Sequence, residues 1–246
     1  MTSRPRLPSR SDPTLVKTLG IIGGIAPAST VEYYRQIIAA YREQRPDGSY
    51  PQLIINSIDL NRMLSFVYAI ELEKLADYLS AEIQKLADAG ADLGLMASNT
   101  PHIVFTQLSA GSPIPLISIV ESTCNAAKQM GLRKLGLVGN RFIMQGRFYP
   151  EVFSKARITL VAPHGDEQEY IHEKYMGELV NENFLAETRE RILAILQRMK
   201  EEDGIEGAIL GGTELPLLLR NPSASGVPFL NTTQIHVQAA VQRLLQ

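Results

Sequence analysis

The amino-acid sequence predicts an α/β protein with two similar α/β domains and mainly parallel sheets. Short apolar runs without polar alternation recur along the chain, and such runs are typical of strands buried on both faces of a parallel sheet. Stretches of helical periodicity separate these runs, as in repeated strand–helix units. A glycine-rich turn and a later strand with a polar tip occur in both halves of the chain. We therefore expect two halves that meet at a cleft, with the boundary between them near Val120.

The expected strands follow from the apolar runs. Residues 18–23 form the first and end in the glycine-rich turn 23–30. Two further runs, which begin at Leu93 and Gly207, break off into small polar residues. The expected strands are 18–23, 53–57, the run from Leu93, 115–119, 134–138, 158–161, the run from Gly207 and 229–230.

The expected helices follow from amphipathic spacing and stop signals. In 71–89, leucine and isoleucine residues fall on one helical face, and Gly90 is a typical residue after a helix end. Residues 58–63 are expected to form a loop. Cys124 lies in the middle of an expected helix and is interpreted as a packing thiol. The expected helices are 31–45, 71–89, 101–108, 121–130, 167–182, 186–202 and 234–245.

The two polar strand tips are the predicted half-sites. Ser98, Asn99 and Thr100 follow the run from Leu93, and the corresponding tip after Gly207 carries Gly212, Thr213 and Glu214. Ligands of open α/β sheets bind just beyond the carboxyl ends of such strands. We expect the two tips to face each other across the cleft.

The glycine-rich turn 23–30 precedes a helix and contains Ile25 and Pro27. Glycines let the backbone approach a ligand, and the free N–H groups of a first helical turn favour an anion such as a carboxylate. The spacing is not that of a dinucleotide-binding fingerprint. A tight strand–helix turn without a ligand is the alternative interpretation.

Composition limits the function classes. The 246 residues are 45% hydrophobic and 20% charged with a net charge of -2, so charge predicts no nucleic-acid partner and no anionic-membrane partner. The single cysteine allows no intrachain disulfide, and no residue spacing suggests a metal site. Residues 1–17 carry four basic residues and no apolar core of signal-peptide length, which predicts a flexible arm and a cytoplasmic protein.

Four motifs resemble those of the aspartate/glutamate racemase family. The turn 23–30 is similar to the first motif of that family. Residues 98–102, Ser-Asn-Thr-Pro-His, resemble its first catalytic motif, which is usually Cys-Asn-Thr followed by a histidine. Residues 212–215 resemble its second, usually Cys-Thr-Glu, and 139–142 resemble a Gly-Thr motif in the matching loop. Together these motifs cover nearly the whole chain from Lys17.

The resemblance implies two α/β domains related by a pseudo-twofold axis, with the site in the cleft. It implies racemisation of an acidic amino acid such as aspartate or glutamate, without pyridoxal phosphate, metal or other cofactor. In that chemistry one cysteine removes the α-proton and the other protonates the opposite face. A homodimer is also implied by the resemblance. The expected domains are 18–120 with 233–246, and 121–232.

This chain departs from the family pattern at the decisive positions. Ser98 and Gly212 stand where the two cysteines belong, and Asn140 replaces the usual threonine. A hydroxyl is a much weaker acid than a thiol, and glycine transfers no proton. His102, His172, Glu214 or a water molecule in the space at Gly212 are the candidate replacements.

The other site residues are binding candidates. Arg62 on one side and His172 or Lys174 on the other are expected to grip the carboxylates of the substrate. The expected substrate-binding set is Ile25, Pro27, Arg62, Asn99, Thr100, Asn140, His172, Lys174 and Thr213. Plain structural roles remain as alternatives. Arg62 would then be a solvated loop residue, His102 and the two threonines would bond the backbone at helix starts, and Glu214 would sit in a first helical turn.

Three functions remain open on the sequence. The first is a racemase or isomerase that acts on a small carboxylic acid with substituted acid–base groups. The second is a decarboxylase or lyase, which needs only one proton transfer. The third is an inactive homologue that binds an amino acid without turnover.

Overall fold

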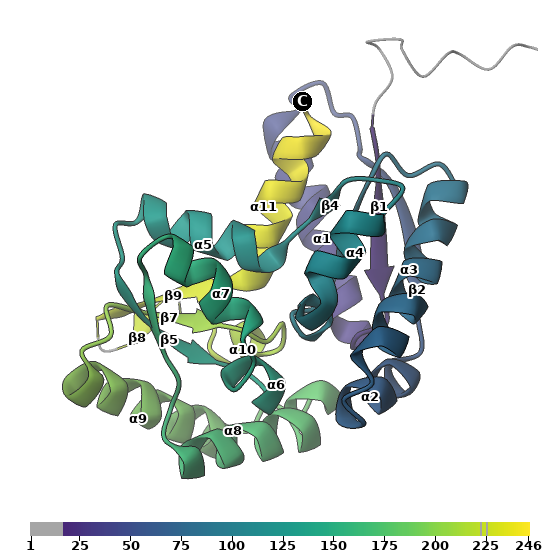
Figure 1. The fold of residues 1–246 in the computed structure, drawn as a ribbon. Helices are drawn as coiled ribbons and strands as arrows, with labels where there is room; N and C mark the ends of the chain where they lie inside the picture. Colours follow the sequence, from purple (N-terminus) through teal and green to yellow (C-terminus); the bar gives the residue numbers. More distant parts are fainter. Residues whose placement is uncertain (1–16, 222, 225) are drawn as a thin grey trace, which may run out of the picture.

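The computed structural model describes residues 17–221, 223–224 and 226–246, and these form two α/β domains, each around its own sheet (Figure 1). The α/β class and the two mainly parallel sheets are confirmed. The predicted flexible arm, apart from Lys17, lies outside the described residues.

The two sheets share one topology. The first has the order β2-β1-β3-β4 and the second the order β6-β5-β7-β9, with β8 added antiparallel at the edge of β9. The first four strands pair in parallel, and so do β6, β5, β7 and β9. The strand bounds are β1 Thr18–Gly23, β2 Gln52–Ser57, β3 Leu93–Met96, β4 Leu116–Ile117, β5 Lys134–Val138, β6 Thr159–Val161, β7 Gly207–Leu210, β8 Ser223–Ala224 and β9 Val227–Asn231.

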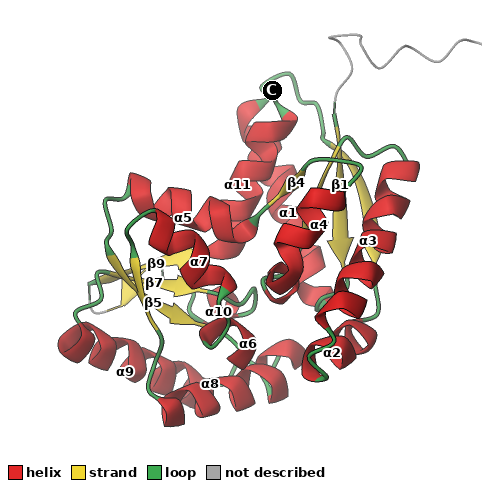
Figure 2. Ribbon diagram, in the orientation of Figure 1, coloured by secondary structure: helices red, strands yellow, loops and turns green. Residues whose placement is uncertain are grey.

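Helices cover both faces of each sheet, as the red and yellow layers of Figure 2 show. The α-helices are α1 Pro27–Gln44, α2 Leu60–Tyr68, α3 Leu72–Asp88, α4 Phe105–Gly111, α5 Ile119–Gln129, α6 Arg141–Met144, α7 Phe148–Lys155, α8 Gly165–Gly177, α9 Ala186–Asp203, α10 Leu215–Leu218 and α11 Thr232–Leu244. Two 3₁₀ helices, Thr100–Val104 and Leu179–Asn181, complete the described elements.

Alternate residues of the inner strands face opposite cores. In β1, Leu19 and Ile21 pack with α1 and α11, while Ile22 packs with α2 and α3 on the other face. In β7, Ile209 packs with α5 and α7, while Leu210 packs with α8 and α9. Both faces of these strands are apolar because both are buried, which is why the sequence shows runs and not alternation.

Helix α11 connects the two domains. Its apolar residues Val237 and Val241 belong to the core around β1 and α1, and it also packs closely against α5. Cys124 of α5 is buried in the core of the second domain, as a packing thiol would be. The exact domain boundaries stay a prediction.

Some local expectations are wrong. Residues 60–63, expected in a loop, begin α2, because the Asp59 side chain caps this helix by accepting from the N–H groups of Asn61 and Arg62. The short helices α6, α7 and α10 were not expected, and the strand expected over 115–119 is only Leu116–Ile117. A short helix offers too little periodicity to be recognised from its apolar residues.

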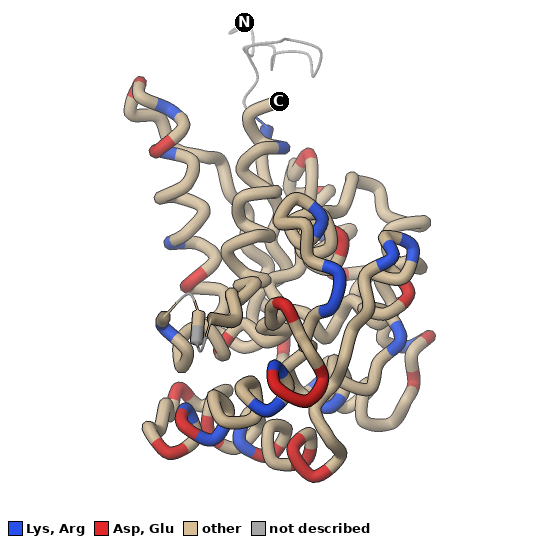
Figure 3. The backbone as a smooth tube through the Cα atoms, turned by 90° about the vertical axis from the view of Figure 1, so that its left-hand side faces the viewer, with Lys and Arg blue, Asp and Glu red and all other residues tan. Residues whose placement is uncertain are grey.

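Charges of both signs are mixed along the helices of the face drawn in Figure 3. Across the described ranges, no helix is both long and apolar enough to cross a bilayer.

Candidate active site

The tips of β3 and β7 meet at one small cavity of about 30 Å³ between the two domains. Ser98 comes from the β3 tip, Glu214 from the β7 tip, and Tyr175 from α8, which reaches across to α2 of the first domain (Figure 1). The lining residues are Ile25, Ala26, Leu60, Met63, Leu64, Ser98, Thr100, Asn140, Tyr175, Met176, Val180 and Glu214.

The strand registers make Ser98 and Gly212 equivalent positions. In the first sheet Met96 of β3 pairs with Ile22 of β1, and in the second Leu210 of β7 pairs with Val138 of β5. Ser98 and Gly212 each stand two residues beyond these paired strand ends. The two halves of the chain therefore place matching tips at the same cavity.

Hydrogen bonds join each tip to the opposite domain. The Asn140 side chain, in the loop after β5, donates to Thr100 Oγ1 of the first domain at 2.9 Å. In the mirrored contact, Ser29 of α1 donates to Glu214 Oε1 at 2.8 Å and lies 2.6 Å from Thr213 Oγ1. Asn140 also caps α6 by accepting from Ile143 N–H. These contacts hold both tips in place.

Glu214 is a buried carboxyl group, 2% exposed, that is surrounded by hydroxyls. Ser29 donates to one of its oxygens, while Thr213 and Tyr175 donate to the other. No Lys, Arg or His is among the residues that line the cavity. The carboxyl group is therefore stabilised by neutral donors and not by a cation.

Tyr175 occupies the space in front of Gly212. A Cβ built on Gly212 would lie 2.2 Å from Tyr175 Cε2 and 2.6 Å from its hydroxyl oxygen. The phenol ring thus stands where a side chain at position 212 would extend. Burial raises the pKa of Tyr175 well above its usual range, and the neighbouring Glu214 adds a smaller increase. The phenol is therefore protonated.

Asn99 and Thr213 are tied to the protein. Asn99 accepts a hydrogen bond from Tyr149 at 2.6 Å and donates to Thr232 Oγ1 at 3.2 Å. Thr213 bonds Ser29 and Glu214. Neither residue lines the cavity, so their contacts order the tips around it.

His102 lies behind the β3 tip and not in the cavity. Its Nε2 accepts from the N–H of Ile119 at 3.1 Å, and the ring stacks on Phe105. Burial, with a smaller contribution from His236, lowers the pKa of His102 to about 3, so the ring is neutral. Its Nδ1 is buried without a hydrogen bond within the described part of the chain.

The structure does not bring the expected carboxylate grips to the cavity. Arg62 is on the exposed face of α2 and stacks on the ring of Tyr78, 4.7 Å from its centroid. Lys174 pairs with Glu178. His172 accepts from the N–H of Arg141, and burial followed by the charge of Arg141 lowers the pKa of His172.

The turn 23–30 contributes its backbone and one apolar side chain. Ile25 lines the cavity, while Pro27 is exposed at the first position of α1. Gly24 has a φ of +82°, and a Cβ there would lie 2.3 Å from the Ile58 carbonyl oxygen, so this position requires glycine. The turn therefore brings the N-terminus of α1 to the cavity.

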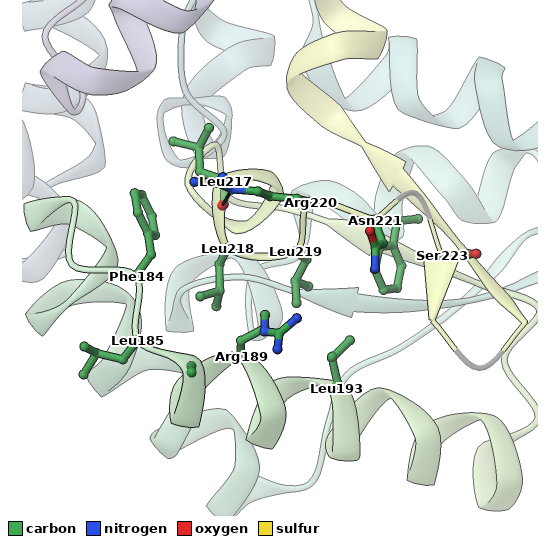
Figure 4. A pocket seen from close by; sticks show the side chains of 12 residues that line it. Phe184, Leu185, Arg189, Leu193, Leu217, Leu218, Leu219, Arg220, Asn221 and Ser223 are labelled. Carbon is green, nitrogen blue, oxygen red and sulfur yellow. Dashed lines mark hydrogen bonds between the residues drawn. The ribbon is translucent and has the colours of Figure 1, made fainter.

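A larger pocket of about 370 Å³ lies elsewhere, between the start of α9 and residues 217–221. Figure 4 shows Arg189 and Leu193 on one side of it and Leu218 and Arg220 on the other. None of the strand-tip residues 98–100 or 212–214 lines it. We therefore place the candidate site in the smaller cavity between the tips.

Tyr175 and Ser29, two hydroxyl-bearing residues that contact Glu214, have no assigned role in the sequence analysis. Tyr175 was placed in a helix only, and Ser29 was part of a motif without a function of its own. The glycine at position 212 was the available signal, because a glycine at a tip leaves space that another side chain fills. Nothing in the spacing identifies residue 175 as that side chain.

Comparisons with known proteins agree with this architecture. A family model described as Asp/Glu/Hydantoin racemase matches residues 22–240. An Asp/Glu racemase candidate from Yersinia pestis is 31% identical, with 94% of this chain and 100% of that chain covered and a TM-score of 0.85. An aspartate racemase homologue from Pyrococcus horikoshii OT3 is also 31% identical over 94% of this chain and 100% of its own, with a TM-score of 0.79. The Picrophilus torridus aspartate racemase is 20% identical over 93% of this chain and 94% of its own, with a TM-score of 0.76, and supports the fold alone.

Proposed function

This chain belongs to the Asp/Glu/Hydantoin racemase family, and we propose that it is an isomerase that labilises the hydrogen on the carbon next to the carboxyl group of a small acid. The proposed chemistry uses neither pyridoxal phosphate nor a metal ion. A small amino acid is the proposed substrate.

The observation that carries this proposal is the meeting of two equivalent strand tips at one cavity. Ser98 lines it from the first domain, and Tyr175 with Glu214 lines it from the second. A planar carbanion between these groups is open to protons from both faces. This is the arrangement that inversion of a stereocentre requires.

The N-terminus of α1 supports a carboxylate ligand. Ile25 and Ala26, directly before this 18-residue helix, line the cavity. The positive end of the helix dipole therefore points toward the carboxyl group of a bound substrate and stabilises it. The same dipole stabilises the negative charge that develops on the carboxyl oxygens when the α-proton leaves.

The lining favours a substrate with a neutral side chain over aspartate or glutamate. A second carboxylate would find no cation among the described lining residues and would lie close to Glu214. Apolar groups from Leu60, Met63, Leu64 and Met176 surround the remaining space. An uncharged substituent avoids the cost of burying an unpaired charge there.

The cavity must open to admit a substrate. A volume of about 30 Å³ holds one or two water molecules and no amino acid. Separation of the domains, or movement of α8 away from α2, would enlarge it. Such closure around a substrate excludes water during the reaction.

A single proton transfer by Tyr175 and Glu214 also suits decarboxylation, which is the second candidate function. The test for both is incubation with separate L- and D-amino acids and with malonate-type acids in D₂O, read by NMR and mass spectrometry. We expect deuterium at the α-carbon of a neutral amino acid. Loss of CO₂ without exchange would establish the second candidate. Binding, seen as a raised melting temperature, without either reaction would leave an inactive homologue.

A further inference from the structure

We propose that the Tyr175 phenol, coupled to Glu214, is the catalytic proton-transfer group on the Gly212 side of the cavity. This inference rests on the proposed function, because it assigns the group that exchanges a proton with the α-carbon. The side chain comes from α8 and not from the β7 tip.

The position of the ring supports the assignment. Gly212 is the register equivalent of Ser98, and a Cβ built on it would meet the ring of Tyr175, which lines the cavity. The Tyr175 hydroxyl oxygen lies 2.6 Å from where the first atom of such a side chain would be, and Tyr175 and Ser98 both line the cavity. The phenol therefore presents its O–H close to the place where the missing side chain would carry its functional group.

Glu214 gives the phenol a proton acceptor. Tyr175 donates to Glu214 Oε2, and a protonated, buried phenol cannot act as a base unless its own proton has somewhere to go. The carboxyl group is in direct contact and is itself at the cavity. The pair combines the reach of the phenol with the acceptor capacity of a carboxylate.

The surrounding hydroxyls have room for one more hydrogen. Four oxygen–oxygen contacts join Ser29, Thr213, Tyr175 and Glu214. Ser29 lies 2.6 Å from Thr213 and 2.8 Å from Glu214, Thr213 lies 3.0 Å from Glu214, and Tyr175 contacts Glu214. Three hydroxyl groups supply three hydrogens when Glu214 is ionised. A proton passed from Tyr175 to Glu214 Oε2 completes the ring, since Oε2 can then donate to Thr213, Thr213 to Ser29, and Ser29 to Oε1. The cluster can therefore hold a proton taken from a substrate.

The proton-removal step balances without a cofactor. The bond between the α-carbon and its hydrogen breaks, and the hydrogen moves as a proton to the Tyr175 oxygen. The phenol proton moves at the same time to Glu214, and the electron pair left on carbon is delocalised into the neighbouring carboxyl group. In D₂O the hydrogen taken from the substrate, now on the Tyr175 oxygen, exchanges with solvent deuterium. The reverse step then returns a deuteron from Tyr175 to carbon, while Glu214 returns its own proton or deuteron to the phenol oxygen.

Each enantiomer presents its α-hydrogen to a different face of the cavity. The Tyr175–Glu214 pair serves one face only, so its loss must affect the two enantiomers unequally. A purely structural defect lowers the activity toward both. Enantiomer-resolved exchange therefore separates a catalytic role from a packing role.

The test measures α-deuterium exchange of each enantiomer separately in the full-length wild type and in three variants. Tyr175→Phe keeps the ring and removes the hydroxyl, and Glu214→Gln keeps the shape and removes the acceptor. Tyr170→Phe, on the same helix but outside the cavity lining, is the matched control. The melting temperature of each variant establishes that it is folded.

We expect Tyr175→Phe and Glu214→Gln to slow exchange of one enantiomer by about 10²- to 10⁴-fold, and Tyr170→Phe to leave both rates unchanged. If folded Tyr175→Phe exchanges both enantiomers at the wild-type rates, the inference is overturned and the proposed function stands. An equal loss for both enantiomers also overturns it. Absence of exchange in the wild type overturns the proposed function itself, and this inference with it.

Discussion

The ring of Tyr175 fills the space that a side chain at Gly212 would need, with Cε2 only 2.2 Å from an ideal Cβ at that position. Gly212 shows no positive φ, so this glycine is required by space and not by backbone conformation. A residue from α8 and a residue at the β7 tip therefore depend on each other. A cysteine at position 212 and the present position of Tyr175 exclude one another.

Gly212→Ala should therefore destabilise the protein through overpacking, by about 1–3 kcal/mol in urea unfolding. The same substitution in a Tyr175→Ala background should cost at least 1 kcal/mol less, as expected for ~0.5–3 kcal/mol coupling between touching residues. Gly177→Ala on α8, where a Cβ meets no atom within 4 Å, is the control and should be nearly neutral. Equal costs of Gly212→Ala in both backgrounds would contradict the contact.

Tyr149→Phe tests the structural role of Asn99. The phenol of Tyr149 donates at 2.6 Å to Asn99 Oδ1, and its removal leaves a buried acceptor without that partner. We expect a loss of about 1–3 kcal/mol in the free energy of unfolding. Phe153→Leu, in the same core but without a polar group, controls for general packing effects. A neutral Tyr149→Phe would show that Asn99 does not need this donor.

The buried histidines predict an acid-sensitive fold. Burial lowers the pKa of His236 to about 4, and burial with the nearby His236 lowers the pKa of His102 to about 3. The unfolded chain takes up protons at these groups below about pH 6.5, while the folded chain does not, so stability is full above pH 6.5 and falls as the pH drops toward 4. Each histidine contributes a slope of at most about 1.4 kcal/mol per pH unit.

The variant His236→Gln provides the comparison for this slope. His236 accepts from Tyr33 at 2.9 Å and donates to the Ile117 carbonyl at 2.9 Å, and glutamine is able to offer both kinds of contact. Between pH 6.5 and 5, we expect unfolding free energies of this variant to fall less steeply than those of the wild type. Identical slopes would mean that His236 is protonated in the folded protein.

A cation introduced into the cavity should change the substrate preference. Met176 is partly buried and lines the cavity from α8, so Met176→Arg adds the charge that the lining lacks. A charge-assisted hydrogen bond of about 1.5–3 kcal/mol should raise the ratio of kcat/KM for aspartate over alanine roughly 10- to 100-fold. Met176→Leu serves as the control for size. An unchanged ratio in a folded, active Met176→Arg variant would show that the acidic side chain does not bind beside α8.

The inner strands could be predicted from the sequence because both of their faces are buried. The apolar runs at residues 18–23 and 134–138 predict strands with the same bounds as β1 and β5. Helix α2 was missed because its start depends on one side chain, Asp59, and its first residues, 60–63, were expected to form a loop. The positions of Ser98 and Glu214 at the cavity could also be predicted, since parallel strands end at one edge of a sheet.

The contents of the cavity could be predicted only in part. Arg62 is at the expected end of β2, but its direction depends on the ring of Tyr78, which draws it to the outside of α2. Tyr175 reaches Gly212 through the packing of α8 across the domain boundary, and no local pattern links positions 37 residues apart. Tertiary contacts of this kind leave no periodic signal in a single sequence.

The most direct test of the account is a crystal structure with 2-aminoisobutyrate, a neutral amino acid that has no α-hydrogen and cannot react. The account predicts its α-carbon between the Ser98 and Tyr175 hydroxyls, with its carboxylate at the N-terminus of α1. The account would be contradicted if 2-aminoisobutyrate bound in the pocket of Arg189 and Arg220 and the cavity between the strand tips held no ligand.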